Sequence, residues 1–175
     1  MQAFIALLRA VNVGGTGKLP MTELKDLCET VGFKSVRTYI ASGNVVFQSA
    51  KTEAQVKAAL EAALAAYAGK PVDVLVRTAA EIAAVLAANP FKEMPGNRTV
   101  AFFLDKPPAA DALCAVSGQA SEQLRLGLRE IYAYYPDGMG GSKLKIPAAK
   151  DGTARNMNTV AKLAEMSAAC AGHST

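Results

Sequence analysis

Apolar residues recur along the chain in several patterns, and the first of them predicts a sheet. Residues 2–9 are apolar at nearly every position, which predicts a strand that is buried on both faces. Residues 35–41 and 45–48 are rich in β-branched and aromatic side chains and predict two further strands. The sequence Ser-Gly-Asn at 42–44 is typical of a tight turn, so we expect these two strands to form a hairpin.

Two helices are predicted in the same half of the chain. Residues 21–31 repeat apolar side chains at three- and four-residue steps, which is the spacing of an amphipathic helix. Thr52 can cap a second helix together with Gln55, three residues on, and this helix is expected to end at Gly69. A fourth strand follows at residues 72–76. The order strand, helix, strand, strand, helix, strand predicts a ferredoxin-like unit with an antiparallel sheet.

The second half of the chain repeats this order of elements, except for a terminal strand. A short helix is predicted at 78–88, a strand at 99–104, a short helix that ends near 116, a hairpin at 123–126 and 130–135, and a last helix at 156–169. We therefore expect an α+β fold of two ferredoxin-like subdomains in tandem, with helices packed on mostly antiparallel sheets. The first subdomain is expected at 1–77, a linking helix and loop at 78–97, and a similar but incomplete subdomain at 98–175.

Composition and charge restrict the chemistry. The 175 residues are 51% hydrophobic and 19% charged, with a net charge of +4, which favours anionic partners without the charge density of a dedicated DNA-binding arm. The only histidine is His173, so Ser-His-Asp triads, paired-histidine metal sites and imidazole acid-base catalysis are excluded. Carboxylates and cysteines form no ligand cluster in the sequence, and we expect neither a metal nor a cofactor.

The cysteines and the apolar segments indicate a compartment. The three cysteines are an odd number at wide spacing, with no Cys-x-x-Cys pair and no signal peptide, which predicts a reduced cytoplasmic protein. The opening apolar run is far shorter than the ~20 residues that span a bilayer, so no membrane association is expected.

Three ordered motifs carry a family resemblance. They are LLRAVNVGG at 7–15, RTYIASGNVVF at 37–47 and GTARNMNT at 152–159. In this order they resemble the bacterial domain-of-unknown-function family 1697, over nearly the whole chain. The resemblance implies an α+β protein of two similar subdomains, and it implies no activity.

The glycine-rich loop at 13–18 is not a nucleotide triphosphatase loop. Such a loop needs a glycine where Asn12 stands and a serine or threonine where Leu19 stands. The loop can still present backbone N–H groups and Lys18 to an anion, or it can serve as a plain turn into the first helix.

Strand order predicts that two of these turns meet. In a ferredoxin-like unit the first and third strands are antiparallel neighbours, so Asn12 and Lys18 are expected beside the turn at 42–44. Arg37 and Tyr39 share one face of the second strand, where they contact either a ligand or solvent. In a hairpin turn, Asn44 is explained more often by a left-handed backbone conformation than by contact with a ligand.

A second candidate anion site lies before the last helix. Arg155 and Asn156 stand at the predicted helix N-terminus, whose free N–H groups and partial positive charge suit a phosphate or carboxylate. The alternative is that Thr153 or Asn156 is only an N-cap and Arg155 forms a structural ion pair. The candidate ligand-contacting residues are Arg9, Asn12, Gly15, Lys18, Arg37, Tyr39, Ser42, Asn44, Arg155, Asn156 and Asn158.

Two further segments have a structural interpretation. Tyr132, Tyr134 and Tyr135 lack the surrounding motif of an RNA-binding sheet, and packing explains them better than base stacking. The glycine-rich stretch at 136–142 is either a plain connection or a lid.

Three functions remain open on the sequence alone. The leading hypothesis is a non-catalytic cytoplasmic protein that binds a phosphorylated or other anionic small molecule, or a nucleic-acid backbone. The first alternative is a metal-independent enzyme on a phosphate-containing substrate, with Ser42 or Tyr39 as the reacting group and Arg155 as the charge clamp. The second is a self-associating interaction module that forms a homo-oligomer.

Overall fold

A computed structural model describes residues 1–11 and 18–172 and divides the chain into two compact units. The first unit consists of Met1–Ala83 together with Lys162–Thr175, and the second is Ala84–Ala161. The chain passes from the first unit to the second within α3 (Ala79–Ala87) and returns within α4 (Met157–Ala171). The end of the last helix, from Lys162, therefore groups with the first unit.

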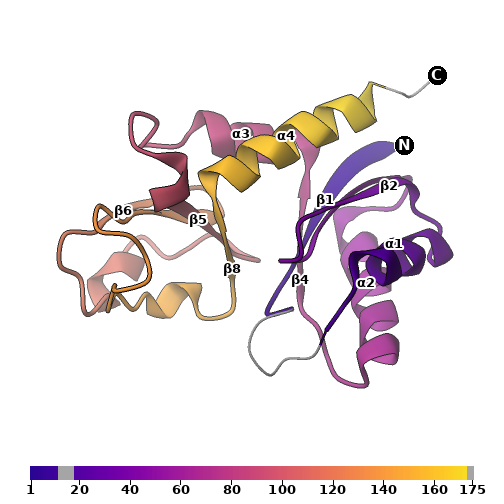
Figure 1. Ribbon diagram of the computed structural model, residues 1–175, viewed down its shortest axis with the longest axis horizontal. Helices are drawn as coiled ribbons and strands as arrows, with labels where there is room; N and C mark the ends of the chain where they lie inside the picture. The colour runs from indigo at the N-terminus through magenta and orange to yellow at the C-terminus, as the bar shows by residue number, and fades with distance from the viewer. Residues whose placement is uncertain (12–17, 173–175) are drawn as a thin grey trace. The chain divides into compact units, whose positions relative to one another are not determined.

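The first unit is a four-stranded sheet with two helices on one face (Figure 1). The strand order is β2-β3-β1-β4, and every neighbouring pair is antiparallel. The sheet therefore confirms the predicted order of elements. Its strands are β1 (Gln2–Leu8), β2 (Lys34–Tyr39), β3 (Asn44–Ser49) and β4 (Val74–Thr78), and its helices are α1 (Met21–Thr30) and α2 (Glu53–Ala68).

Both ends of α2 follow the predicted capping signals. The Gln55 backbone N–H donates to Thr52 Oγ1 at 3.2 Å, and the Thr52 N–H donates to Gln55 Oε1 at 3.0 Å, which is a complete capping box. The helix ends at Gly69, whose φ of 70° lies in the left-handed region that glycine adopts without strain.

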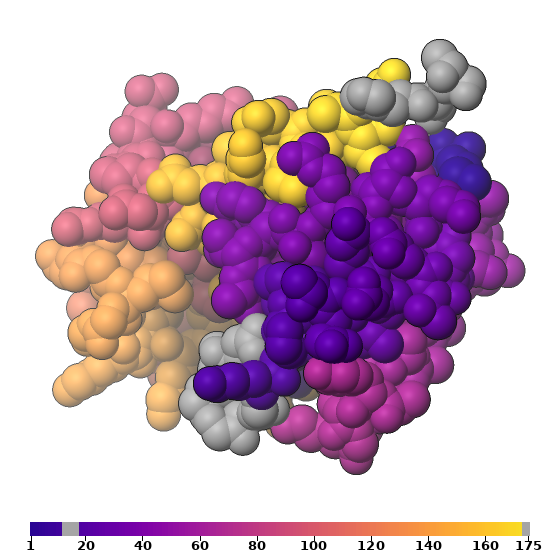
Figure 2. All heavy atoms as spheres, turned by 45° about the vertical axis from the view of Figure 1, so that its right-hand side comes forward, coloured from indigo at the N-terminus to yellow at the C-terminus, as the bar shows by residue number. Residues whose placement is uncertain are grey.

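The central strands β1 and β3 are buried on both faces, as the unbroken apolar run of β1 predicted, whereas most of β2 is exposed or half-buried. Phe4, Ala6 and Leu8 face the helices, and Phe47 stacks on Phe33 with ring centroids 4.2 Å apart. Leu7 and the other alternate residues face the opposite side and are equally buried. At the end of β3, Gln48 Nε2 donates to the Cys170 carbonyl at 2.8 Å, and Figure 2 shows this end of α4 against the purple surface of β2 and β3.

The second unit contains a sheet of the same order, β6-β7-β5-β8, and again every pair is antiparallel. Its strands are β5 (Thr99–Phe103), β6 (Gln123–Leu126), β7 (Glu130–Tyr134) and β8 (Thr153–Asn156). The prediction that this half lacks a terminal strand was wrong, because Thr153–Asn156 form β8. Strand β8 has four residues and no apolar run, so only its pairing with β5 reveals it.

Short turns take the place of helices over this second sheet. The helix predicted to end near residue 116 is a single 3-10 turn, Ala112–Ala115. Two more 3-10 turns lie at Gly96–Arg98 and Pro147–Ala149. Leu113, Leu144 and Ile146 from these loops pack on a small core around Val100 and Leu124.

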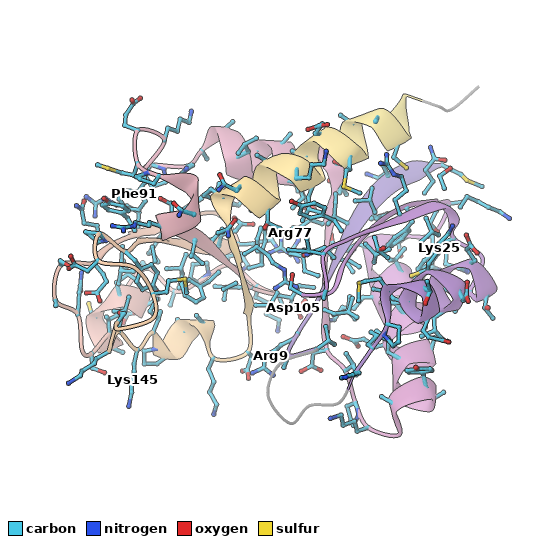
Figure 3. All side chains as sticks on the ribbon, viewed as in Figure 1. Arg9, Lys25, Arg77, Phe91, Asp105 and Lys145 are labelled. Atoms are coloured by element: carbon cyan, nitrogen blue, oxygen red, sulfur yellow. The ribbon has the colours of Figure 1, made fainter. Side chains whose placement is uncertain are left out.

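The two units share a residue-level repeat at the end of the last strand. β4 carries Arg77 and β8 carries Arg155, both buried, and in each case the next residue caps a helix. Figure 3 shows Arg77 on the side of β4 that faces away from α1 and α2. The Glu81 N–H donates to Thr78 Oγ1 at 3.1 Å before α3, and the Thr159 N–H donates to Asn156 Oδ1 at 2.9 Å before α4.

Within the described residues, no helix combines the length and the apolar composition that a bilayer crossing requires.

Candidate anion-binding pocket

A pocket of about 790 Å³ lies in the first unit at the corner where β1 ends and β4 begins. Its walls come from residues 9–11 after β1, residues 18 and 19 before α1, the last turns of α2, and residues 70–73 before β4. These segments meet because β1 and β4 are antiparallel neighbours, with Leu8 opposite Val74. Figure 3 labels Arg9 at this corner.

Arg9 and Asp73 join two of the pocket walls. The Arg9 backbone N–H donates to the Asp73 carbonyl at 2.9 Å, and Arg9 Nη1 lies 3.5 Å from Asp73 Oδ2. Both side chains are partly exposed, so their ion pair contributes only about 0–1 kcal/mol to stability. An incoming anion can therefore compete with Asp73 for the Arg9 guanidinium.

Ala10 adopts an uncommon backbone conformation at the edge of the pocket. Its φ is 53°, in the left-handed region that costs a residue with a Cβ roughly 1–2 kcal/mol. Such strain persists only where the surrounding structure fixes it, and it is concentrated at binding sites.

The pocket combines a positive rim with an apolar floor. Arg9, Lys18 and Lys70 are opposed by the single carboxylate of Asp73, which leaves a formal charge of +2 on the described lining. The C-terminus of α2 contributes about half a negative charge, which is less than this excess. Val11, Leu19 and Leu64 are buried below the rim, and the Tyr67 side chain on α2 is 45% exposed.

Lys57 and Glu61 of α2 hold the wall from which Asp73 projects. Glu61 Oε1 accepts hydrogen bonds from the Val74 N–H at 3.0 Å and from Lys57 Nζ at 2.7 Å. Lys57 Nζ also donates to the Val74 carbonyl at 2.5 Å. The first residue of β4 is thus fixed to α2 through both of its backbone polar groups.

Two of the residues predicted from the sequence line this pocket, Arg9 and Lys18. Asn12 and Gly15 lie outside the described residues. The residues that the sequence analysis missed are Tyr67, Lys70 and Asp73. The signal was available, because the start of the fourth strand must lie beside the end of the first in the predicted sheet.

The predicted meeting of the first and third strands is confirmed. The Leu8 N–H donates to the Gly43 carbonyl at 2.9 Å, and a Cβ on Gly43 would lie 2.6 Å from Val11 Cγ2. The polar side chains of this turn are nevertheless used internally. Asn44 is 0% exposed, and its Nδ2 donates to the Tyr39 carbonyl and to Ser42 Oγ, each at 2.9 Å.

Arg37 lies on β2, toward the end of α4. Its charge counteracts part of the effect of burial on Cys170, whose pKa is raised mainly by loss of solvation. Arg37 is therefore associated with the C-terminal end of this helix and does not line the pocket.

Three predicted residues belong to the second unit. Arg155 is 7% exposed, and its Nη1 donates to Thr153 Oγ1 at 2.7 Å and to the Ala154 carbonyl at 2.9 Å. Burial lowers the pKa of Arg155 to about 10. Asn156 caps α4, as the alternative interpretation held, and Asn158 packs against the backbone of Gly96.

The corresponding corner of the second unit has the opposite charge. A pocket of about 410 Å³ lies where β5 ends and β8 begins. Its described lining includes Asp105 and Asp151 but only one cation, Lys106. The repeated fold therefore presents a positive pocket in one unit and a negative one in the other.

The tyrosines and the glycine-rich connection have structural roles. Tyr132 OH donates to the Val85 carbonyl at 2.9 Å, and burial raises its pKa to about 12. The Tyr134 ring lies 5.9 Å from that of Phe91, so packing explains this run. The connection at 136–142 is bonded at both ends, by Arg98 to the Pro136 carbonyl and by Ser142 Oγ to Glu122 Oε1 at 2.5 Å.

Side chains suited to metal binding or thiol chemistry are dispersed. Within the described part of the chain, His, Cys, Asp and Glu side chains form no group of three or more that could hold a metal ion. The cysteines are free thiols, and burial raises the pKa of Cys28 to about 12.

Together these features define an α+β protein with two four-stranded antiparallel sheets and a cationic pocket at one corner of the first. The chain belongs to the family described as protein of unknown function (DUF1697), whose sequence profile matches residues 1–132. A comparison with curated proteins finds no match.

A solved structure has the same fold. The conserved bacterial protein SP0830 from Streptococcus pneumoniae is 24% identical, and the match covers 94% of this chain and 98% of that one with a TM-score of 0.78. At this identity the likeness concerns the fold alone.

Proposed function

We propose that this protein binds an anionic small molecule, and specifically a phosphorylated one, in the pocket between the end of β1 and the start of β4. The observation that carries the proposal is the arrangement of Arg9, Lys18 and Lys70 around a concave site with one carboxylate. Guanidinium and ammonium groups are the side chains that recognise phosphate most strongly, by charge-assisted hydrogen bonds.

The shape of the pocket favours a small ligand over a polymer. Its volume of about 790 Å³ falls within the range of roughly 300–1,000 Å³ that is usual for small-molecule sites. A nucleic-acid backbone is recognised instead by a positive surface that follows several phosphates, and its binding weakens steeply with salt. We therefore expect binding that depends only weakly on ionic strength.

A binding role is better supported than catalysis. The enzyme hypothesis places the reacting group on Ser42 or Tyr39, and neither residue lines the pocket. Ser42 Oγ and the Tyr39 carbonyl both accept hydrogen bonds from Asn44, which gives them a role in closing the turn.

A thermal-shift titration with ribose 5-phosphate tests the proposal. The ligand should raise the melting temperature of the wild-type protein, because it binds only the folded state. The double variant Lys18→Ala/Lys70→Ala should lose this shift. Lys25→Ala is the matched control, since Lys25 is an exposed lysine of the same unit that lies on α1, away from the pocket lining (Figure 3).

Two results would contradict the proposal. One is an equal shift in the wild-type protein and the double lysine variant, which would place the ligand elsewhere. The other is no shift at any ligand concentration up to saturation of the assay. A shift with short oligonucleotides alone, lost at higher salt, would favour a nucleic-acid ligand instead.

A further inference from the structure

We infer that the ligand of this pocket is a nucleoside phosphate, with its base against Tyr67 and its phosphate at the lysines. The inference rests on the proposed function and narrows it to one class of ligand.

The pocket is too large and too apolar for a bare anion. Inorganic phosphate would engage the cationic rim and leave most of the 790 Å³ to water. The apolar lining residues Tyr67, Ala68, Pro71 and Val72 keep part of their surface exposed, and only a ligand with an uncharged body can cover it. Burying that surface adds favourable free energy that a small inorganic ion cannot supply.

The aromatic ring of Tyr67 favours a ligand whose uncharged part is planar. Tyr67 stands on the last turn of α2, and the residue remains 45% exposed, although it lines a pocket with a buried floor. Bases stack on such aromatic side chains whatever their identity, because every base has a π-face. A flexible alkyl chain would bury apolar surface against the same ring but would not gain the additional stacking interaction.

Asp73 favours a ligand that carries donors as well as charge. Its carboxylate is 62% exposed and lies beside the cationic groups that would hold a phosphate. A ligand with phosphates alone would be repelled by this carboxylate, whereas a sugar hydroxyl can donate to it. Acidic side chains bind ribose hydroxyls in this way in dinucleotide sites.

The second unit provides an internal comparison. Its pocket at the corresponding corner contains Asp105 and Asp151 against Lys106, and this balance repels a phosphate. The proposal therefore predicts one nucleotide bound per chain, although the fold of the sheet is repeated.

Isothermal titration calorimetry with AMP, ribose 5-phosphate and adenosine tests the inference. AMP should bind at a stoichiometry of one and about 10-fold or more tighter than ribose 5-phosphate, from the added stacking of the base. Adenosine should bind more weakly than AMP, because it lacks the phosphate. Tyr67→Leu should bring AMP to the affinity of ribose 5-phosphate and leave the latter unchanged, whereas Tyr67→Phe should keep the preference.

The outcomes separate this inference from the proposed function. Equal affinities for AMP and ribose 5-phosphate in the wild-type protein would show that the pocket does not recognise the base. This result would overturn the inference of a nucleoside phosphate and leave the proposed anion binding intact. Failure of both to bind, or binding that persists in Lys18→Ala/Lys70→Ala, would overturn the proposed function itself. If octyl phosphate binds more tightly than AMP, the inference of a nucleoside phosphate is overturned in favour of a lipid-like ligand. The comparison of AMP with ribose 5-phosphate in the wild-type protein tests the inference even if a Tyr67 variant fails to fold.

Discussion

Glu61 on α2 accepts a hydrogen bond at 3.0 Å from the backbone N–H of Val74, the residue with which β4 begins. Asp73 turns its carbonyl toward β1, so the next residue turns its polar groups away from the sheet. β4 is an edge strand of the sheet, and the outward-facing backbone N–H and C=O groups of an edge strand must be hydrogen-bonded or shielded. The side chain of Glu61 does so and fixes the wall of the pocket at the same point.

Removal of this carboxylate should destabilise the protein. Glu61→Ala leaves the Val74 N–H without its partner, and we expect a loss of about 1–2 kcal/mol in the free energy of unfolding, measured by urea denaturation. Glu165→Ala is the control, since Glu165 is largely exposed and pairs with Lys162 at 3.3 Å on α4. That change should cost less than about 0.5 kcal/mol. Equal losses in the two variants would show that the bond to Val74 contributes nothing.

A pair of glycines separates backbone strain from steric exclusion. Gly69→Ala requires a left-handed alanine in open space and should cost roughly 1–2 kcal/mol. Gly43→Ala meets the same strain at φ 86° and also a clash with Val11 and Leu8, which should add roughly 1–3 kcal/mol. Thermal unfolding of both variants measures the difference. A Gly43→Ala protein as stable as Gly69→Ala would mean that the end of β1 does not pack on this turn.

Glu122 should make part of the stability depend on pH. The hydrogen bond from Ser142, with a second from the Ala120 N–H, holds the pKa of Glu122 below its usual value. A carboxyl whose pKa is lowered by folding stabilises the folded state at pH values above its unfolded-state pKa of about 4.3. This stabilisation is lost as the pH falls through the folded-state pKa.

Ser142→Ala tests this linkage. The variant should be less stable than wild type at pH 7, and the difference should shrink as the pH falls through the lowered folded-state pKa of Glu122, below which this carboxyl is protonated in both proteins. Ser142→Thr keeps the hydroxyl and should retain the wild-type profile. Urea unfolding across this pH range provides the measurement, and a difference that is constant with pH would refute the linkage.

Asn156 should act on stability and not on binding. Asn156→Ala removes the cap of α4 and should cost about 0.5–2 kcal/mol, whereas Asn156→Asp should restore most of it. Calorimetry with ribose 5-phosphate should give the same affinity for all three proteins. A loss of affinity in Asn156→Ala alone would indicate that Asn156 contacts the ligand.

Local signals in the sequence were sufficient for much of the fold. The apolar run of β1 and the pair Thr52 and Gln55 act through contacts within one element, so their pattern can be interpreted without the rest of the chain. β8 escaped prediction because a four-residue strand owes its existence to its partner β5 and not to its own composition. The loops that replace helices over the second sheet are likewise determined by tertiary packing.

The candidate site was predictable in part, for a related reason. Arg9 lies in the motif at 7–15 and Lys18 lies in the glycine-rich loop at 13–18, and both segments stand out in the sequence. Lys70 and Asp73 look like ordinary loop residues until the strand order brings them beside Arg9. Arg155 suggests an anion site because it is a cation before a helix, whereas in β8 it is buried and its Nη1 donates to Thr153 Oγ1 and to the Ala154 carbonyl.

The return of the chain to the first unit through α4 has a consequence for biosynthesis. Residue Cys170, whose carbonyl receives the Gln48 bond, emerges from the ribosome only after the whole of the second unit has been made. At roughly 5–20 residues per second, the first unit must wait several seconds between translation of its last strand and arrival of this partner. The second unit, continuous in sequence, can complete its fold during that interval.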